Sequence, residues 1–176
     1  MLDILLAICP DLPTPVIITL PLIFDNFFTA KGYLMYSPNS NKDLKNLDRK
    51  IDINNIFTQN RLSLNDSVEG GQSITIGGEY SLKGKENGND IIKAGLATVL
   101  RDEEEINLPS KSTLNNKGSD FIGSLVFEPN KNFKFDYNFS IDSDFESSNY
   151  NFLKTDILVN KFVTSFEFLQ EDDEVG

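Results

Sequence analysis

The feature that most constrains the fold is a strict alternation of apolar and polar residues along several segments of the chain. Residues 133–142 show it most clearly, and their odd positions are Phe133, Phe135, Tyr137, Phe139 and Ile141. Their even positions are polar and include Lys134, Asp136, Asn138 and Ser140. Residues 71–83 repeat the pattern, with Ser73, Thr75 and Glu79 among the polar positions. A period of two predicts β-strands that have one apolar and one polar face.

The alternating segments are long for β-strands. We predict strands over residues 29–37, 71–83, 91–101, 119–128, 131–141, 150–159 and 161–170, with 52–62 as a possible further strand. A tilted strand needs about nine to eleven residues to cross the hydrocarbon layer of a membrane. Strands of soluble proteins are commonly about five or six residues long. The lengths therefore favour strands that span a membrane.

The connections between these segments alternate between short and long. The short ones are 84–90, 129–130 and 160–161, and the long ones are 38–70, 102–118 and 142–149, with another long one expected from residue 171 onward. Outer-membrane barrels keep short turns on the periplasmic side and long loops outside. A soluble β-sandwich has no reason to keep this order, although it would share the alternating strands.

Together these patterns predict an all-β fold: an antiparallel up-and-down meander that forms a partial, open outer-membrane β-barrel over residues 25–176. Residues 1–24 are apolar but contain Pro10, Pro13, Pro15 and Pro21. We predict an irregular segment there, because prolines interrupt regular structure; the alternative is a buried, irregular first strand of a small domain. It lacks the basic region and cleavage site of a signal peptide. We expect the chain to be part of a larger protein and this segment to be an artefact of a truncated or frame-disturbed reading frame.

Composition excludes several classes of function. The net charge of −11 argues against a nucleic-acid-binding protein, which needs a basic surface to neutralise phosphates. The sequence has no histidine, so a Ser/His/Asp triad and histidine-containing zinc sites are excluded. Cys9 is the single cysteine and has no partner in the chain. We expect no catalytic residues, no metal site and no cofactor.

Residues 46–71 carry a resemblance to a known family. The stretches 46–57 (NLDRKIDINNIF) and 60–71 (NRLSLNDSVEGG) resemble the barrel of the LPS-assembly protein LptD family, also described as the organic solvent tolerance protein family. Residues 127–131 (FEPNK) and 137–139 (YNF) are similar to hairpins farther along the same barrel. The resemblance extends from about residue 29 to the end of the chain.

The resemblance implies a non-enzymatic role in the outer membrane of a Gram-negative cell. Members of the family form a 26-stranded barrel that, with a plug lipoprotein called LptE, inserts lipopolysaccharide (LPS) into the outer leaflet. LPS would arrive over a periplasmic bridge and a jellyroll domain and leave through a lateral opening between the first and last strands. The matched residues correspond to the middle of that barrel, and Cys9 does not match the paired cysteines of the family.

Two sets of residues are candidates for functional positions. Arg61, Asp66 and Glu69 are expected to form a polar network that holds an extracellular loop over or into the lumen, or else an ordinary ion-pair network of a loop. The polar faces of two strands are expected to line the lumen, with Ser73, Thr75, Glu79, Lys134, Asp136, Asn138 and Ser140. Two other functions stay open on the residues alone: a different outer-membrane barrel, such as a porin or receptor, and a soluble β-domain that binds a partner by its sheet edge.

Overall fold

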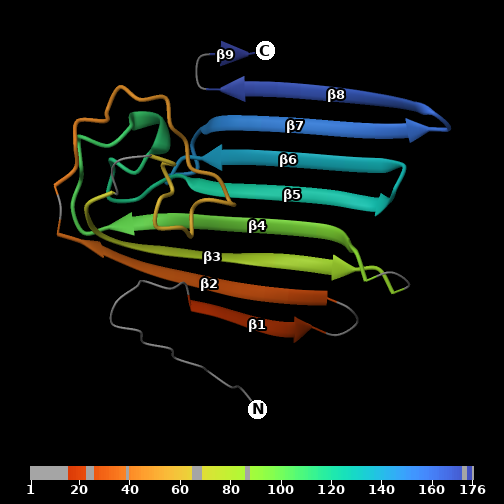
Figure 1. Ribbon diagram of the computed structural model, residues 1–176, viewed down its shortest axis with the longest axis horizontal. Helices are drawn as coiled ribbons and strands as arrows, with labels where there is room; N and C mark the ends of the chain where they lie inside the picture. Colours follow the sequence, from red (N-terminus) through yellow and green to blue (C-terminus); the bar gives the residue numbers. More distant parts are fainter. Residues whose placement is uncertain are drawn as a thin grey trace.

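A computed structural model describes residues 16–22, 26–38, 40–64, 69–85, 88–171 and 174–175. Within these residues, nine strands form one antiparallel sheet whose spatial order is the order of the chain (Figure 1). The strands are β1 (Val16–Leu22), β2 (Asn26–Ser37), β3 (Gly71–Lys83), β4 (Asp90–Arg101), β5 (Phe121–Asn130), β6 (Phe133–Ile141), β7 (Ser148–Val159), β8 (Phe162–Glu171) and β9 (Glu174–Val175). The predicted all-β, up-and-down meander is confirmed.

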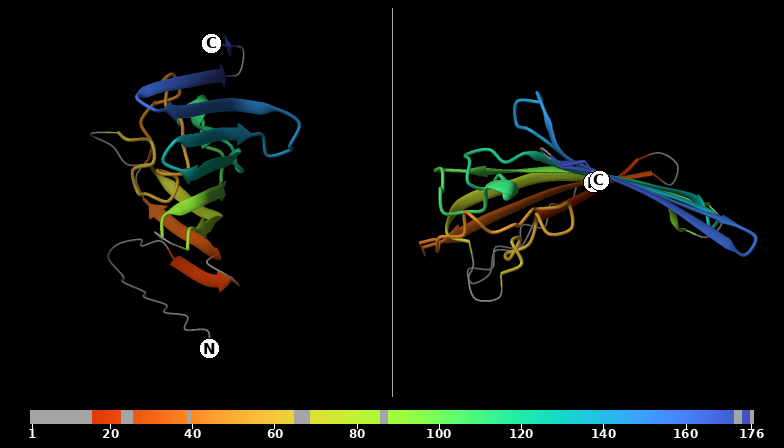
Figure 2. Two further views of the ribbon diagram at one scale, coloured as in Figure 1. Left: turned by 90° about the vertical axis from the view of Figure 1, so that its right-hand side faces the viewer. Right: turned by 90° about the horizontal axis from the view of Figure 1, so that it is seen from above.

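The sheet is a single twisted layer that stays open. Its two outer strands, β1 and β9, lie at opposite ends of the strand order and do not pair with each other among the described residues (Figure 2). Open, strongly twisted sheets of this size expose one strand edge on each side. Among the described residues, no helix is long and apolar enough to cross a membrane.

The seven strands predicted from the alternation correspond to β2 through β8, and their ends agree within three residues. The possible strand over 52–62 is wrong, because residues 53–62 form consecutive turns. Asp52 explains the difference: its Oδ1 accepts the backbone N–H groups of Asn54 and Asn55 at 2.7 and 2.9 Å. A side chain that binds its own backbone in this way competes with strand pairing.

Residues 16–22 correct the prediction of an irregular N-terminal segment. They form β1, which pairs with β2 in a register that places Pro21 opposite Phe27. Proline is tolerated here because β1 is the outer strand of the described sheet, where one side of the backbone needs no ladder hydrogen bond. The rest of segment 1–24, including Cys9, lies outside the described residues.

Two predicted connections are also corrected. The turn between β5 and β6 lies at residues 131–132 instead of 129–130, because Pro129 is accommodated in a bulge and Asn130 accepts the N–H of Asn132 at 2.9 Å. The long loop expected from residue 171 is wrong, since β9 returns to pair with β8. The turn at Asn160 and Lys161 is confirmed, with Asn160 at a positive φ of 56°.

The long connections of the described chain lie at one end of the sheet, and the short β3–β4, β5–β6 and β7–β8 turns lie at the other (Figure 1). We call these the long-loop end and the short-turn end. The long-loop end carries residues 40–64, 69–70, 102–120 and 142–147, and the short-turn end carries the β3–β4, β5–β6 and β7–β8 turns. The predicted alternation of short and long connections therefore places the long loops at one end of the sheet and these short turns at the other.

The strand register defines two faces of different polarity. Thr75 pairs with Val99, and Ala97 pairs with Ile122, which in turn pairs with Ser140. Because alternate residues share a face, this chain of pairs places seven residues on one face: Ser73, Thr75, Glu79, Lys134, Asp136, Asn138 and Ser140. We call it the polar face. The opposite, apolar face leaves large side chains exposed: Leu34, Ile76, Leu96 and Phe166.

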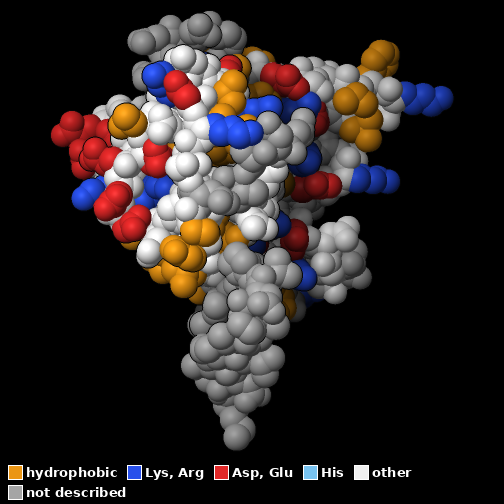
Figure 3. All heavy atoms as spheres, turned by 60° about the vertical axis from the view of Figure 1, so that its left-hand side comes forward, with side chains coloured by type: hydrophobic (Ala, Val, Ile, Leu, Met, Phe, Trp, Pro, Cys, Tyr) orange, Lys and Arg blue, Asp and Glu red, His pale blue; other side chains and the backbone are white. Residues whose placement is uncertain are grey.

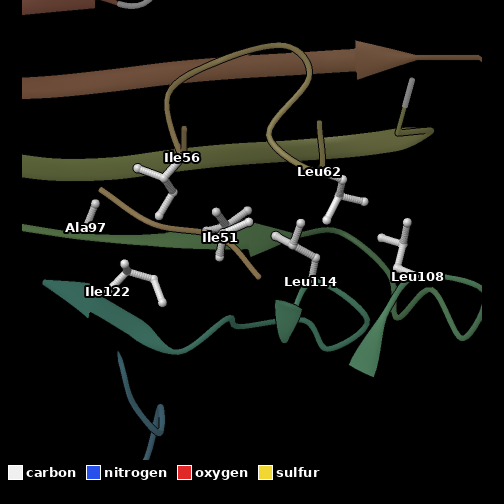
Figure 4. Close-up of a cluster of buried hydrophobic side chains, with 8 residues drawn as sticks. Ile51, Ile56, Leu62, Ala97, Leu108, Leu114 and Ile122 are labelled. Atoms are coloured by element: carbon white, nitrogen blue, oxygen red, sulfur yellow. The ribbon is translucent and has the colours of Figure 1, made fainter. Parts of the chain in front are cut away.

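The two longest loops fold back onto the polar face, and the hydrophobic core lies between these loops and the sheet. Residues 40–64 and 102–118, called here the loop cluster, contribute Ile51, Ile56, Leu62, Leu108 and Leu114 to it. The sheet contributes Ala97, Val99 and Ile122 (Figure 4). Burying an aliphatic side chain of this size stabilises a fold by about 1.5–3 kcal/mol. The loops are therefore held against the sheet by apolar packing, at the long-loop end.

Candidate functional site

A buried ion pair joins the loop cluster to the residues that lead into β3. Arg61 donates from Nε to Glu69 Oε2 at 2.7 Å and from Nη2 to Glu69 Oε1 at 2.8 Å. The two residues are only 1% and 3% exposed. A bidentate pair of this kind has the strongest geometry available to arginine and carboxylate. The structure thus brings Arg61 and Glu69 together, whereas Asp66 lies outside the described residues.

The same guanidinium also reaches the polar face of β3. Its Nη1 donates to Thr75 Oγ1 at 3.0 Å and its Nη2 to Ser73 Oγ at 2.7 Å. Both hydroxyl residues are buried beneath the loop cluster. Arg61 therefore bonds a carboxylate and two strand side chains at once, which fixes residues 60–62 over β3. In this structure Ser73 and Thr75 face a loop, and their expected place in lining a lumen stays a prediction.

Arg101 completes the network and was not foreseen from the sequence. It ends β4 on the polar face, and its Nη1 forms an ion pair with Glu69 Oε1. Its Nη2 donates to the carbonyl oxygen of Gly70 at 2.7 Å. One carboxylate is thus shared by two buried arginines. We call Arg61, Glu69 and Arg101 the latch. The only sequence feature that pointed to Arg101 was its position as a charged residue at the end of a predicted strand.

Two glycines let the loop cluster approach the sheet closely. A Cβ atom at Gly77 would lie 2.8 Å from the Phe57 ring, and one at Gly95 would lie 2.9 Å from Cγ1 of Ile53. Real Cβ atoms do not come that close to other atoms, so a side chain at Gly95 would push the loop away. One at Gly77 would meet Phe57 and also Ala97 and Leu96 of β4, both at 2.6 Å. Glycine in a strand often marks such a close approach. The absence of a side chain at Gly77 and Gly95 therefore allows the loop to pack closely against the polar face.

The remaining predicted lumen residues lie on the polar face outside the latch. Glu79 forms an ion pair with Lys31 and lies 3.9 Å from the ammonium of Lys93. Asn138 donates to Asp136 at 2.8 Å. Lys134 pairs in register with Asp156 of β7. These groups form a polar surface of alternating charge, and their predicted role in lining a lumen stays a prediction.

Acidic side chains gather on the long-loop end of the molecule (Figure 3). Asp102, Glu103 and Glu104 are exposed there, directly after the latch residue Arg101. Within the described part of the chain, no group of three or more His, Cys, Asp or Glu residues is placed to hold a metal ion. The acidic run is thus a solvated part of the loop cluster.

The sequence was compared with models of known protein families. The chain matches the family LptD, LPS transport system D, over residues 30–173 of its 176 residues. The chain belongs to the LptD family. The match covers most of β2, all of β3 through β8 and both parts of the loop cluster, and it confirms the resemblance carried by residues 46–71. A search of curated proteins gave no match. Membership makes the chain a component of LPS transport and sets aside an unrelated porin or receptor.

Proposed function

We propose that this chain is a section of the barrel wall of the outer-membrane translocon that assembles LPS at the cell surface. The observation that carries the proposal is the separation of the two faces in a chain of the LptD family. Large apolar side chains are exposed on one face, including Leu34 at 68% and Phe166 at 60%. Contiguous exposed apolar surface of this kind is rare in soluble monomers and suits contact with lipid.

The polar face would line the aqueous lumen of the complete barrel. Its charged and amide groups satisfy one another in pairs, such as Lys31 with Glu79 and Asn138 with Asp136. A wall of this kind offers hydration and shape but no reactive group. Transport would therefore depend on the width and polarity of the lumen, without bond chemistry.

The loop cluster would act as a closure of the lumen at the cell-surface side. It lies on the polar face at the long-loop end, and long loops of outer-membrane barrels face the outside. The latch and the Gly77 and Gly95 contacts hold it in place. In the complete protein we expect LPS, an LptE-like plug lipoprotein and the periplasmic LPS bridge as partners, in the outer membrane.

Depletion of the full-length protein tests this function. Cells carrying a repressible copy are pulse-labelled for newly made LPS, and LPS at the surface is measured on intact cells. We expect surface LPS to fall while newly made LPS accumulates in the inner membrane. Restoring the wild-type gene should reverse both changes. Unchanged surface LPS together with a loss of uptake of small solutes would instead support a porin-like channel.

A further inference from the structure

A cavity of about 530 Å³ lies between the loop cluster and the wall formed by β5 to β8. None of the latch residues lines it. The loop cluster contributes Asp52 and Lys111 to its lining, and the wall contributes Asp120, directly before β5, and Tyr150 of β7. Its volume lies within the range of about 300–1,000 Å³ that small-molecule sites occupy. The cavity can therefore hold a small ligand that contacts both the loop cluster and the wall.

Asp120 is a buried carboxylate that forms no ion pair with any described residue. It is 4% exposed, and its Oδ2 accepts hydrogen bonds from Ser140 Oγ at 2.6 Å and Asn149 Nδ2 at 2.8 Å. Its Oδ1 bonds to no described residue and is not one of the fully enclosed side-chain atoms that lack a partner. Oδ1 therefore remains open to the cavity that Asp120 lines. Because a buried charge is costly without a charged partner, Asp120 favours a cation in the cavity.

A second carboxylate without a cation partner lines the cavity from the loop cluster. Asp52 Oδ1 accepts backbone N–H groups of its own turn, and the side chain forms no ion pair with a described residue. The third carboxylate of the lining, Glu171, already pairs with Lys50 and Lys111, the two lysines of the lining. The charge that remains without a partner is therefore that of Asp52 on the loop side and Asp120 on the wall side.

Aromatic rings make the cavity suited to an organic cation. Tyr150 and Phe152 line it from the polar face, because they pair in register with Ser140 and Asn138. The ammonium of Lys50 lies 4.9 Å from the centre of the Tyr150 ring, so this ring already contacts a primary ammonium group. A magnesium ion fits less well, since it needs several oxygen ligands and the described residues place no group of three or more metal-binding side chains together.

We infer that this cavity binds a small organic diamine, with one ammonium group at Asp120 and the other at Asp52, and that the bound diamine holds the loop cluster against the wall. The two carboxylates belong to the two parts of the chain that form the cavity. A ligand that contacts both parts binds this arrangement better than one in which the loops have left, so it stabilises the docked loops. The inference goes beyond the proposed function and requires no contact with LPS.

Binding of the diamine putrescine to the purified full-length protein in detergent tests the inference. Calorimetry is carried out at about 0.15 M salt, which screens the general attraction between a cation and an acidic protein. We expect putrescine to bind and to slow hydrogen exchange at residues 50–54 and 110–113. Butylamine, which has the same carbon chain but one ammonium group, is the matched probe and is expected to bind about tenfold more weakly. Magnesium chloride at equal concentration is expected not to displace putrescine.

Two conservative variants locate the site. Asp120→Asn and Asp52→Asn each remove one charge and keep a side-chain oxygen that can accept hydrogen bonds. Each is expected to weaken putrescine binding by about tenfold and to remove most of the difference between putrescine and butylamine. Asp136→Asn is the matched control, because Asp136 also lies on the polar face but does not line the cavity. It is expected to bind putrescine as the wild type does.

Several results would overturn the inference. They are absence of putrescine binding by the wild type, equal binding of putrescine and butylamine, displacement of putrescine by magnesium, and loop exchange that bound putrescine leaves unchanged. An equal loss of binding in Asp136→Asn and Asp120→Asn would reveal only a general attraction to acidic surface and would also overturn it. The butylamine comparison uses the wild type, so it decides even where a variant fails to fold. Any of these results leaves the proposed function standing, because the depletion experiment tests that function separately.

Discussion

The polar face has two regions that share the same alternating sequence and differ in what covers them. Under the loop cluster, the side chains of Arg61 and Glu69 are 0% and 2% exposed. On β7 and β8, the pair Lys154 and Glu167 has an N–O distance of 2.6 Å, but its side chains are 38% and 54% exposed. Breaking the first pair leaves a buried charge without a partner, which costs much free energy, whereas water screens the charges of the second pair. Ion pairs of similar N–O distance thus have very different consequences for stability, depending on whether a loop covers them.

The largest effect is expected from Glu69→Ala, which leaves Arg61 and Arg101 buried without a counter-charge. Removing one partner of a buried pair commonly costs about 3–5 kcal/mol. Hydrogen exchange of residues 43–62 in the full-length protein should therefore show loss of protection of the loop cluster. Glu104→Ala, at an exposed position of the same end, is the matched control. Unchanged protection in Glu69→Ala would show that the latch does not hold the loops.

A slightly smaller effect is expected from Ile56→Ala in the core of the loop cluster. Ile56 is fully buried, and truncating a buried isoleucine costs about 2–5 kcal/mol through lost packing and a cavity. The same exchange measurement should show faster opening of the loops. Leu47→Ala provides the comparison within the same loop, because Leu47 is 43% exposed. If both variants opened equally fast, apolar packing would not be what holds the loop cluster.

Gly95→Val tests the close approach of loop and sheet. The new side chain would meet Ile53, and overpacking of this kind costs about 1–3 kcal/mol. We expect trypsin to cleave after Arg49 or Lys50 faster than in the wild type. Gly32→Val is the matched control, since nothing lies within 4 Å of a Cβ atom at Gly32. Equal cleavage rates in the two variants would contradict a tight fit at Gly95.

The smallest effect is expected from Lys154→Ala in the uncovered region. Its ion pair with Glu167 is exposed, so solvent already screens it. The exchange rates of the loop cluster and the thermal unfolding of the full-length protein should stay as in the wild type at low and high salt. A clear loss of stability would mean that the uncovered region is also protected from water.

The strands and their faces could be predicted because they depend on a local property, the period of two. Lys134, Asp136 and Asn138 share a face for that reason alone. The loop cluster could not be predicted in the same way. Its core residues, such as Leu108 and Leu114, are isolated apolar residues in polar loops and follow no period. Only the folded loops bring them onto Val99 and Ile122.

The candidate site was predictable in part for a similar reason. Arg61 and Glu69 stand within one short motif, so their pairing is nearly local. Arg101 is 32 residues from Glu69 and joins the latch only because β3 pairs with β4 in a particular register. Asp52 shows the opposite failure, since its turn-forming side chain overrides an apparent strand pattern. Distant partners and side-chain-to-backbone bonds are what the alternation cannot reveal.

The most direct test of the central claim is to measure which solvent each face of β6 contacts. Single cysteines are placed at positions 134 to 139 of the full-length protein, free of other cysteines, in outer-membrane vesicles, and carry a nitroxide spin label. We predict that a water-soluble nickel chelate quenches the label at 134, 136 and 138, whereas oxygen dissolved in lipid relaxes it at 135, 137 and 139. Equal access of the nickel chelate to all six positions would contradict a wall with one lipid face and one lumen face.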